Sequence, residues 1–270
     1  MRLDGILQRR GVGLLKSKHY NTQAEWLYVW NHYQDIKSQT DTEAMIADCV
    51  AEIRSICKGR HPAFAWSGGK DSIALQIVCE DAGIEKSFCC YNDLYFAKSI
   101  DFFKRNAPNG CVLHNSGEDI KWLAKHPDML FPKVPHRWNI QTHLKYQPVF
   151  CREHDVDILL MGKRSQDMNH VPKEIVAKSK DGIDIYCPIR KWTHEDVICA
   201  IRYRNKSLSP IYFTEEGFHY GDTKFAVMGP MKGETEQDAW RRIYVIEPEK
   251  VIESATWGLR GAREFLRGLL

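Results

Sequence analysis

The sequence predicts an α/β fold with a doubly wound, mainly parallel sheet flanked by helices, and with helical N- and C-terminal extensions. Two observations support this prediction. Short apolar runs alternate with amphipathic runs of helical length, which is the order of strand–helix–strand units. A glycine-rich loop at residues 67–72 follows one apolar run and directly precedes a helical run. In such sheets, ligands bind beyond the carboxyl ends of the strands, where the strand order reverses.

The composition is that of a globular protein without a strong general affinity for nucleic acid. Of 270 residues, 43% are hydrophobic and 11% are aromatic, which is enough for a continuous core. The formal net charge of +3 is too small to indicate a general nucleic-acid binder. Residues 121–180 hold eleven Lys and Arg against six Asp and Glu, which suits an anionic substrate or, equally, a solvated surface. Nucleic acid is therefore a weakly supported partner.

The nine cysteines favour a reducing compartment. They are scattered, apart from adjacent Cys89 and Cys90, and they form no Cys-x-x-Cys motif. Cys151 and His154 are spaced like half of a metal site, but no second pair completes it. No apolar run approaches the roughly 20 residues that span a bilayer. We therefore expect a cytoplasmic protein with reduced thiols and no membrane association.

Residues 1–60 are predicted to form a helical N-terminal extension. Thr40 and Glu43 have the spacing of a capping box, and the residues after them place apolar side chains on one helical stripe. We interpret the stripe as a core face. It comprises Met45, Ile46, Cys49, Val50, Ile53, Ile56 and Cys57.

Residues 61–232 contain the predicted strand and helix units. The predicted strands cover residues 63–66, 86–92, 111–114 and 155–161. Helices are predicted from residue 72 to near Gly83 and over residues 97–105. Residues 233–270 carry aromatic and aliphatic side chains among balanced charges. They are predicted to form a helical C-terminal extension that packs on the core or on a partner subunit.

The loop at residues 67–72, with the sequence SGGKDS, has the features of a phosphate-binding loop. It lacks the Gly-x-x-x-x-Gly-Lys-Ser/Thr spacing of a nucleotide-hydrolysing P-loop. Gly68 and Gly69 remove side-chain bulk, so successive backbone N–H groups can converge on an anion at the start of the following helix. Lys70 adds a mobile ammonium group.

The other side chains of this loop have more than one interpretation. Ser67 and Ser72 offer hydroxyl donors to a phosphate. Asp71 would repel a phosphate, so it either orients the loop by accepting backbone N–H groups or reaches the phosphate through Mg²⁺. The structural alternative is a Gly-Gly turn in which Asp71 or Ser72 caps the helix.

SGGKDS resembles the signature of the PP-loop superfamily, also called the N-type ATP pyrophosphatases or adenine nucleotide alpha-hydrolases. The resemblance implies an adenine nucleotide alpha-hydrolase-like fold, with residues 61–232 as the nucleotide-binding domain. It also implies ATP as the cofactor, with Mg²⁺ on its phosphates and Asp71 as a weak candidate ligand of that ion. Members typically cleave ATP between the α- and β-phosphates, and the loop holds the pyrophosphate.

Three further segments are similar to the phosphoadenosine phosphosulfate (PAPS) reductase-like family, which includes the ATP-sulfurylase small subunit. Residues 161–167 (MGKRSQD) resemble its Gly-x-Arg-Arg-x-Glu/Asp stretch. Residues 186–197 (YCPIRKWTHEDV) resemble its Asn-Pro-Leu/Ile-x-x-Trp-x-x-x-Asp-Val stretch, and residues 205–212 continue that match. The resemblance implies that Gly162 and Arg164 contact the nucleotide. It also implies that Asp93 lies beside the adenosine.

Lys163 and Arg164 follow a predicted buried strand and are, with Lys70, the candidate catalytic residues. Arg presents a planar fork to phosphate oxygens and Lys a point charge. Together the three side chains could neutralise charge that builds up at the α-phosphorus. A solvated basic loop is the structural alternative for Lys163 and Arg164.

Arg137, Lys145 and Asp222 are the candidate residues for binding a second substrate. Arg137 and Lys145 resemble the family's Arg-Trp-Cys…Lys element, although Asn139 stands where cysteine is usual. They could bind an anionic group, and a surface role explains them nearly as well. Asp222 lies in residues 218–224, whose glycine and polar residues are typical of a late active-site loop.

Two residues near this region have a structural interpretation. Thr193 and Asp196 have the spacing of a capping box before an apolar run, so Asp196 is expected to cap a helix. Trp192 is expected to anchor the packing of that helix.

The resemblance, together with these residues, implies an enzyme that uses ATP to adenylylate a small anionic acceptor, or a nucleotide, and that releases pyrophosphate. A thiol-dependent sulfonucleotide reductase is the alternative, but the family's cysteine near the carboxyl terminus is missing, since no cysteine follows Cys199. A non-catalytic nucleotide-binding subunit is the third interpretation. The aromatic C-terminal segment is compatible with a partner subunit or a homo-oligomer.

Overall fold

The computed structural model describes residue 15 and residues 21–134, 136–167 and 171–270. At its centre is a six-stranded sheet with the order β3-β2-β1-β4-β6-β5. The strands are β1 Pro62–Ala65, β2 Ser87–Tyr91, β3 Val112–Asn115, β4 Ile158–Leu160, β5 Val176–Lys178 and β6 Asp184–Tyr186. Neighbouring strands pair in parallel, except that β5 pairs antiparallel with β6. The predicted α/β class with a mainly parallel sheet is confirmed.

The strand order reverses between β1 and β4. The chain winds from β1 through β2 to β3 on one side, and then places β4 on the other side of β1. Phe64 in β1 pairs with Ser87 of β2 and with Leu160 of β4. The carboxyl ends of β1 and β4 therefore form the edge where a ligand is expected.

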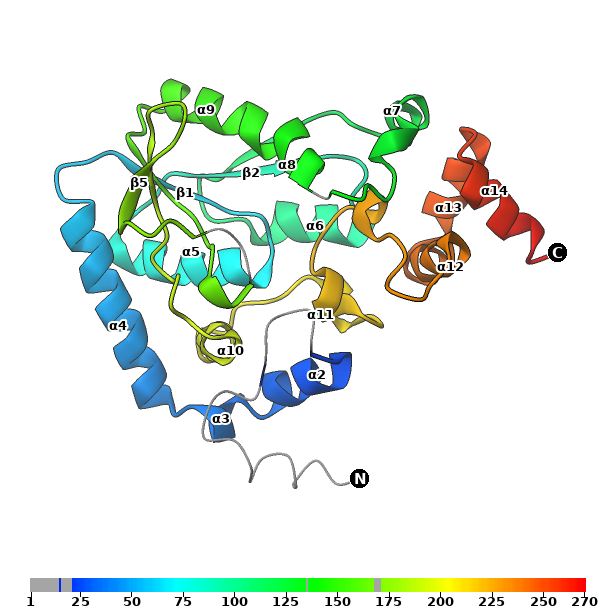
Figure 1. Ribbon diagram of the computed structural model, residues 1–270. Helices are drawn as coiled ribbons and strands as arrows, with labels where there is room; N and C mark the ends of the chain where they lie inside the picture. The colour runs from blue at the N-terminus through cyan, green and yellow to red at the C-terminus, as the bar shows by residue number, and fades with distance from the viewer. Residues whose placement is uncertain (1–14, 16–20, 135, 168–170) are drawn as a thin grey trace.

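Helices cover both faces of the sheet (Figure 1). On one face, α5 (Lys70–Ala82) packs against α4 (Gln39–Ile56) and α10 (His194–Tyr203). On the other face, α9 (His143–Glu153) packs against β2. The other α-helices of the described residues are α2 Gln23–Asn31, α3 Tyr33–Ile36, α6 Ala97–Asn106, α7 Ile120–Lys125, α8 His136–Gln141, α11 Gly217–Tyr220, α12 Glu236–Ile246, α13 Pro248–Thr256 and α14 Arg260–Arg267, and the 3₁₀ turns are η2 Pro127–Met129, η3 Ser165–Asp167, η4 Pro210–Phe213 and η5 Phe225–Val227.

The described part of the N-terminal extension is helical, as predicted, while residues 1–14 and 16–20 of that extension lie outside the described residues. The buried side chains of α4 are Thr42, Ile46, Cys49, Val50 and Ile53. The predicted capping box of Thr40 and Glu43 is wrong, because α4 begins at Gln39 and Thr40 lies inside it. The cap is Ser38, whose hydroxyl accepts the N–H of Asp41 at 3.0 Å. Ser38 and Asp41 have the same spacing as the predicted pair, Thr40 and Glu43, but lie two positions earlier in the chain.

The predicted capping box before α10 is confirmed. The Thr193 hydroxyl accepts the N–H of Asp196, and the Asp196 carboxylate accepts the N–H of Thr193. Lys37 donates to the same carboxylate, which joins the N-terminal helices to α10. Trp192 is buried in the hydrophobic core, as expected for a packing anchor.

The C-terminal helices α12, α13 and α14 pack on the core of this chain. They share one hydrophobic cluster with the segment after β2 and with α7, and this cluster includes Phe96, Ile120, Trp240 and Phe265. The carboxylate of Glu247 accepts the first N–H of α6, from Ala97, at 2.7 Å. An N-terminus of the central domain is thus capped from the C-terminal extension.

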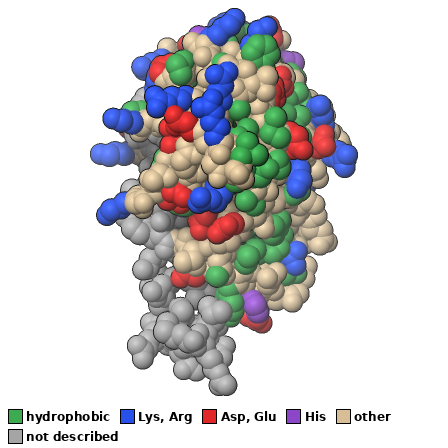
Figure 2. All heavy atoms as spheres, turned by 90° about the vertical axis from the view of Figure 1, so that its right-hand side faces the viewer, with side chains coloured by type: hydrophobic (Ala, Val, Ile, Leu, Met, Phe, Trp, Pro, Cys, Tyr) green, Lys and Arg blue, Asp and Glu red, His purple; other side chains and the backbone are tan. Residues whose placement is uncertain are grey.

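The outer face of the C-terminal helices carries charges of both signs. Figure 2 shows Lys and Arg side chains interspersed with Asp, Glu and hydrophobic side chains on the side of the molecule where these helices lie. Arg260 pairs with Glu264 at 2.6 Å, and Arg241 pairs with Asp238 at 2.8 Å. None of the helices in the described part of the chain combines the length and the apolar character needed to cross a bilayer.

Candidate active site

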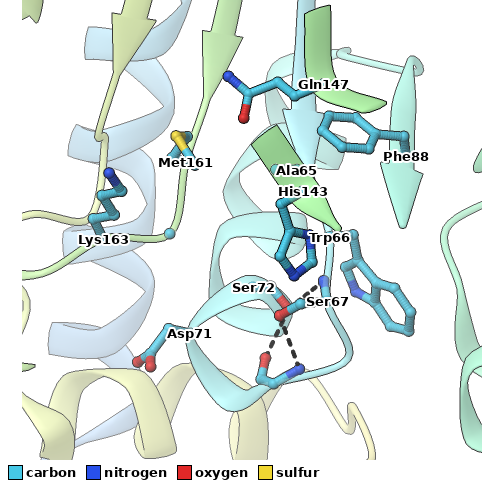
Figure 3. A pocket seen from close by; sticks show the side chains of 12 residues that line it. Ala65, Trp66, Ser67, Asp71, Ser72, Phe88, His143, Gln147, Met161 and Lys163 are labelled. Atoms are coloured by element: carbon cyan, nitrogen blue, oxygen red, sulfur yellow. Dashed lines mark hydrogen bonds between the residues drawn. The ribbon is translucent and has the colours of Figure 1, made fainter. Parts of the chain in front are cut away.

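A cavity of about 250 Å³ lies at the carboxyl ends of β1 and β4 (Figure 3). Its walls come from the loop after β1, from the residues after β4, from β2 and from α9. The lining residues are Ala65, Trp66, Ser67, Gly69, Asp71, Ser72, Phe88, His143, Gln147, Met161, Gly162 and Lys163. The cavity therefore lies at the edge where the strand order reverses, which is the position that parallel sheets use for ligands.

The loop between β1 and α5 is braced by its own serines. β1 ends at Ala65 and α5 begins at Lys70, so the loop is shorter than predicted. The Ser72 hydroxyl accepts the N–H of Ser67 at 3.1 Å and donates to the carbonyl of Gly69 at 2.8 Å. The Ser67 hydroxyl lies 3.2 Å from the Ser72 hydroxyl. Both hydroxyls thus hold the loop in shape, whereas the sequence suggested donors to a phosphate.

Gly68 adopts a backbone conformation that only glycine occupies without strain. Its φ is 72°, and a Cβ atom there would lie 2.4 Å from Cε1 of Phe103. Gly69 has a φ of −74° and caps α5 without a side-chain hydrogen bond. The two glycines therefore have different roles, since Gly68 makes the turn and Gly69 leaves the start of the helix open.

Backbone N–H groups converge at this start of α5. The N–H groups of Gly68, Asp71 and Ser72 make no hydrogen bond with any described residue, whereas Lys70 donates its N–H to the Tyr212 hydroxyl at 2.9 Å. Unpaired N–H groups at a helix N-terminus, added to the helix dipole, favour an anion at that point. The loop has the geometry of an anion site.

Lys70 and Arg164, which the sequence placed at a phosphate, are not among the residues that line the cavity. Lys70 is 2% exposed, and its ammonium donates to both carboxylate oxygens of Asp71 at 2.9 and 2.8 Å. Arg164 is fully buried and donates to Asp71 at 2.7 Å and to Asp167 at 2.8 Å. These side chains form a buried ionic network behind the loop.

Asp71 is the side chain of this network that reaches the cavity. Burial alone would raise the pKa of its carboxyl, but Lys70 and Arg164 outweigh burial and lower it to about 2. Burial also lowers the pKa of the Lys70 ammonium. The Asp71 carboxylate therefore stays ionised, with both oxygens bonded to cationic groups.

The residues at the cavity do not fit a magnesium ion held by Asp71. A divalent cation there would meet the positive charges of Lys70 and Arg164 at hydrogen-bond distance from the same carboxylate. Within the described ranges, no cluster of three or more His, Cys, Asp or Glu side chains could hold a metal ion. The predicted role of Asp71 as a metal ligand has no support in this geometry.

Lys163 is the one Lys or Arg among the described residues that line the cavity. The Lys163 ammonium makes no hydrogen bond or ion pair with any described residue, so it is available to an anion. Gly162 fixes its position, because a Cβ atom at Gly162 would lie 2.9 Å from the carbonyl oxygen of Asp71. The residues after β4 thus pack directly on the first turn of α5.

His143 and Gln147 line the cavity from α9, and neither was singled out from the sequence. They are one helical turn apart, so both side chains project from the same face of α9. In Figure 3 the imidazole of His143 lies above Ser67 and Ser72. Burial, and then the nearby Lys224 ammonium, lower the pKa of His143 to about 4, so the imidazole is neutral at pH 7.

Arg137, Lys145 and Asp93 do not line this cavity. Arg137 donates to the carbonyl of Asp128 at 3.0 Å and is exposed. Lys145 lines a separate groove of about 780 Å³ and donates to Gln141 at 2.8 Å. Asp93 is exposed after β2, and its carboxylate accepts from Asn115 at 3.0 Å. The predicted substrate and adenosine roles of these three residues gain no support from their positions.

Asp222 is also separate from the cavity. Both of its carboxylate oxygens are buried, which raises the pKa to about 7, while the hydroxyls of Ser99 and Ser209 act in the opposite direction. Lys224, two residues later, is buried against the ring of Tyr95, and burial lowers its pKa to about 8. The predicted contact of Asp222 with a substrate is not supported, because the carboxylate faces protein.

The same region of the sequence matches a known family. Residues 61–229 match the family described as the phosphoadenosine phosphosulfate reductase domain, which is more than half of the chain. The chain belongs to this family. The predicted membership of the PP-loop superfamily is thereby confirmed for this PAPS reductase domain protein. No curated protein matches the sequence significantly.

Several solved structures are similar to this PAPS reductase domain protein at low sequence identity. PAPS reductase from Candida auris, as a phosphate complex, is 12% identical with a TM-score of 0.48, over 64% of this chain and 90% of that one. NMN synthetase from Francisella tularensis is 14% identical with a TM-score of 0.45, over 83% and 95%. Yeast FAD synthetase, in complex with FAD, is 13% identical with a TM-score of 0.41, over 72% and 70%.

Gly68→Ala is expected to strain the loop of this family member, because the positive φ and the contact with Phe103 both disfavour a side chain. We expect the free energy of unfolding to fall by about 1–3 kcal/mol. Gly69→Ala is the matched control, since its Cβ atom would meet nothing closer than 3.4 Å. Urea denaturation measures both variants. Equal destabilisation of the two would contradict the assigned role of Gly68.

Asp222 is expected to make stability depend on pH with a defined sign. Its pKa is about 7 in the folded protein against the ordinary 3.8 of an unfolded chain, so the folded state holds this proton more tightly. The resulting stabilisation is complete below about pH 4 and is lost as the pH rises through 7. Asp222→Asn is expected to remove up to about 4 kcal/mol of this dependence.

Urea denaturation of both proteins between pH 4 and pH 8 measures that difference. Asp71 and Lys224 act outside this window, because their pKa values of about 2 and about 8 place their effects below pH 4 and above pH 8. If the difference in the free energy of unfolding between wild type and Asp222→Asn stays constant with pH, the carboxyl group does not titrate as described.

Proposed function

We propose that this protein binds ATP across the carboxyl ends of β1 and β4 and cleaves it between the α- and β-phosphates. AMP would pass to a small anionic acceptor, and pyrophosphate would be released. The observation that carries this proposal is the pair of unpaired N–H groups at Asp71 and Ser72, two residues that line the same cavity as Lys163. Membership of the PAPS reductase domain family supports nucleotide chemistry at this position.

The two charged regions of the cavity suit the two ends of a bond that breaks. The loop amides and the N-terminus of α5 would hold the β- and γ-phosphates. Lys163, on the opposite wall, would face the α-phosphate. An acceptor oxygen attacks the α-phosphorus, and the electron pair of the α–β bridge leaves on pyrophosphate. The protein has to position these groups and to neutralise charge, and no protein nucleophile is required.

Asp71, Lys70 and Arg164 act indirectly in this proposal. Their ionic network fixes the first turn of α5 and the residues after β4, and so sets the positions of the loop amides and Lys163. Asp71, already bonded to Lys70 and Arg164, does not fit a magnesium ion. Magnesium would enter as part of the nucleotide.

The cysteines disfavour a thiol-dependent reductase. None of the nine lines the cavity, and burial is the largest cause that raises the pKa of every one. The thiolate is the nucleophilic form, so a raised pKa suppresses the reactivity that reduction of a sulfonucleotide requires. Adenylyl transfer makes no such demand on the chain.

Pyrophosphate release tests the proposal directly. Purified protein is incubated with ATP, Mg²⁺ and candidate acceptors, namely sulfate, carboxylates and nucleotides, and both pyrophosphate and AMP products are measured. Equal amounts of the two support adenylyl transfer. Sulfite from PAPS with a thiol donor would instead support the reductase. Tight ATP binding without turnover would support a non-catalytic subunit.

Lys163→Ala is expected to lower the rate of pyrophosphate release by roughly 100-fold or more, because it removes a cation that faces the developing charge. Lys191→Ala is the matched control, since Lys191 is exposed and lies outside the cavity. Its rate should equal that of the wild type. A Lys163→Ala protein with the wild-type rate would refute the assignment of Lys163.

A further inference from the structure

The cavity changes character along its length. At the end near the loop it presents Ser67, Ser72 and His143. At the other end its walls are the ring of Phe88 and the thioether of Met161. Figure 3 shows the Gln147 amide at this second end, between Met161 and Phe88 and on the far side from the serines. A polar group therefore lies within the apolar half of the cavity.

The Gln147 amide is open to the cavity. The residue is 8% exposed, and its side chain makes no hydrogen bond with any residue that the structure describes. An amide carries donors beside an acceptor. A ligand that enters the apolar end with a complementary donor and acceptor would therefore pair with both groups of the amide.

The ligand best suited to this end is a flat, largely apolar ring with a donor and an acceptor side by side on its edge. Adenine has this arrangement, since its N6 amino group donates while N1 and N7, on either side of it, accept. The glutamine amide pairs with adenine through both of its groups. Phe88 and Met161 supply apolar contacts to the ring faces or rim.

We propose that Gln147 reads the edge of the nucleobase and selects adenine over guanine. This inference rests on the proposed function, because it concerns the base of a nucleotide whose phosphates lie at the loop. The base lies at the apolar end of the cavity, and the Gln147 amide donates to the ring nitrogen and accepts from the amino group. His143, one turn earlier on α9, faces the phosphate end, so one helix contacts both halves of the ligand.

The experiment compares the affinities of ATP, GTP and inorganic pyrophosphate for three proteins by titration calorimetry. The wild type is expected to bind ATP about tenfold or more tightly than GTP. Gln147→Met keeps the length of the side chain but removes the amide. Its ATP affinity should fall about tenfold, its ATP-to-GTP ratio should approach one, and its pyrophosphate affinity should not change.

Gln147→Glu is the second variant, and we expect it to shift the preference from ATP toward GTP. A carboxylate accepts but does not donate, so it lacks a donor for the ring nitrogen of adenine. It can accept from the N1–H and amino groups of guanine, and the preference should move toward GTP. Gln39→Met is the matched control, because Gln39 is an exposed glutamine at the start of α4.

The outcomes separate this inference from the function on which it rests. If the wild type binds ATP and pyrophosphate, but both Gln147 variants keep the wild-type ATP-to-GTP ratio, then Gln147 does not read the base and only this inference fails. If the wild type binds neither ATP nor pyrophosphate, the proposed function fails and the inference fails with it. A fall in the ratio that Gln39→Met reproduces would likewise overturn the assignment.

Discussion

The carboxylate of Asp71 is the contact on which the rest of the site depends. It accepts from Lys70 on its own helix and from Arg164, which follows β4. The loop after β1 and the residues after β4 form two walls of the cavity, so this pair of ion contacts sets their separation. Breaking a buried ion pair by removing one partner typically costs about 3–5 kcal/mol. The joint between the walls is therefore rigid.

Because of the same network, the positive potential of the cavity does not come from Lys70 and Arg164. Two cations, Lys70 and Arg164, face two carboxylates, Asp71 and Asp167, so their formal charges balance behind the loop. Among the described residues that line the cavity, what remains for an anion is the ammonium of Lys163, together with the backbone dipoles at the start of α5. The backbone dipoles are fixed by the fold and need little rearrangement when charge develops, which is the arrangement that favours electrostatic catalysis.

Local sequence signals predicted the parts of the structure that depend on local interactions. The strand–loop–helix order around Ser67, the capping box of Thr193 and the position of Lys163 all follow from residues near one another in the chain. The directions in which side chains point do not follow from such local signals. Lys145 was selected because it resembles the lysine of the family's Arg-Trp-Cys…Lys element, but it lies about 200° around α9 from His143 and lines a different groove. Lys70 was taken as mobile, because Asp167, one of the two carboxylates beside its ammonium, is distant in sequence. Strands β5 and β6 were missed because their residues, VAK and DIY, each include a charged side chain, whereas β4, which is equally short, lies within an apolar run.

The cap that Glu247 places on Ala97 joins residues 150 positions apart. During synthesis, the segment after β2 emerges long before its covering helices exist, and Phe96 and Ile120 lack their partners Trp240 and Phe265 for that time. Such late contacts slow folding and leave apolar surface open to aggregation. The nascent chain is consequently most vulnerable on the ribosome, in the interval before its final helices are translated.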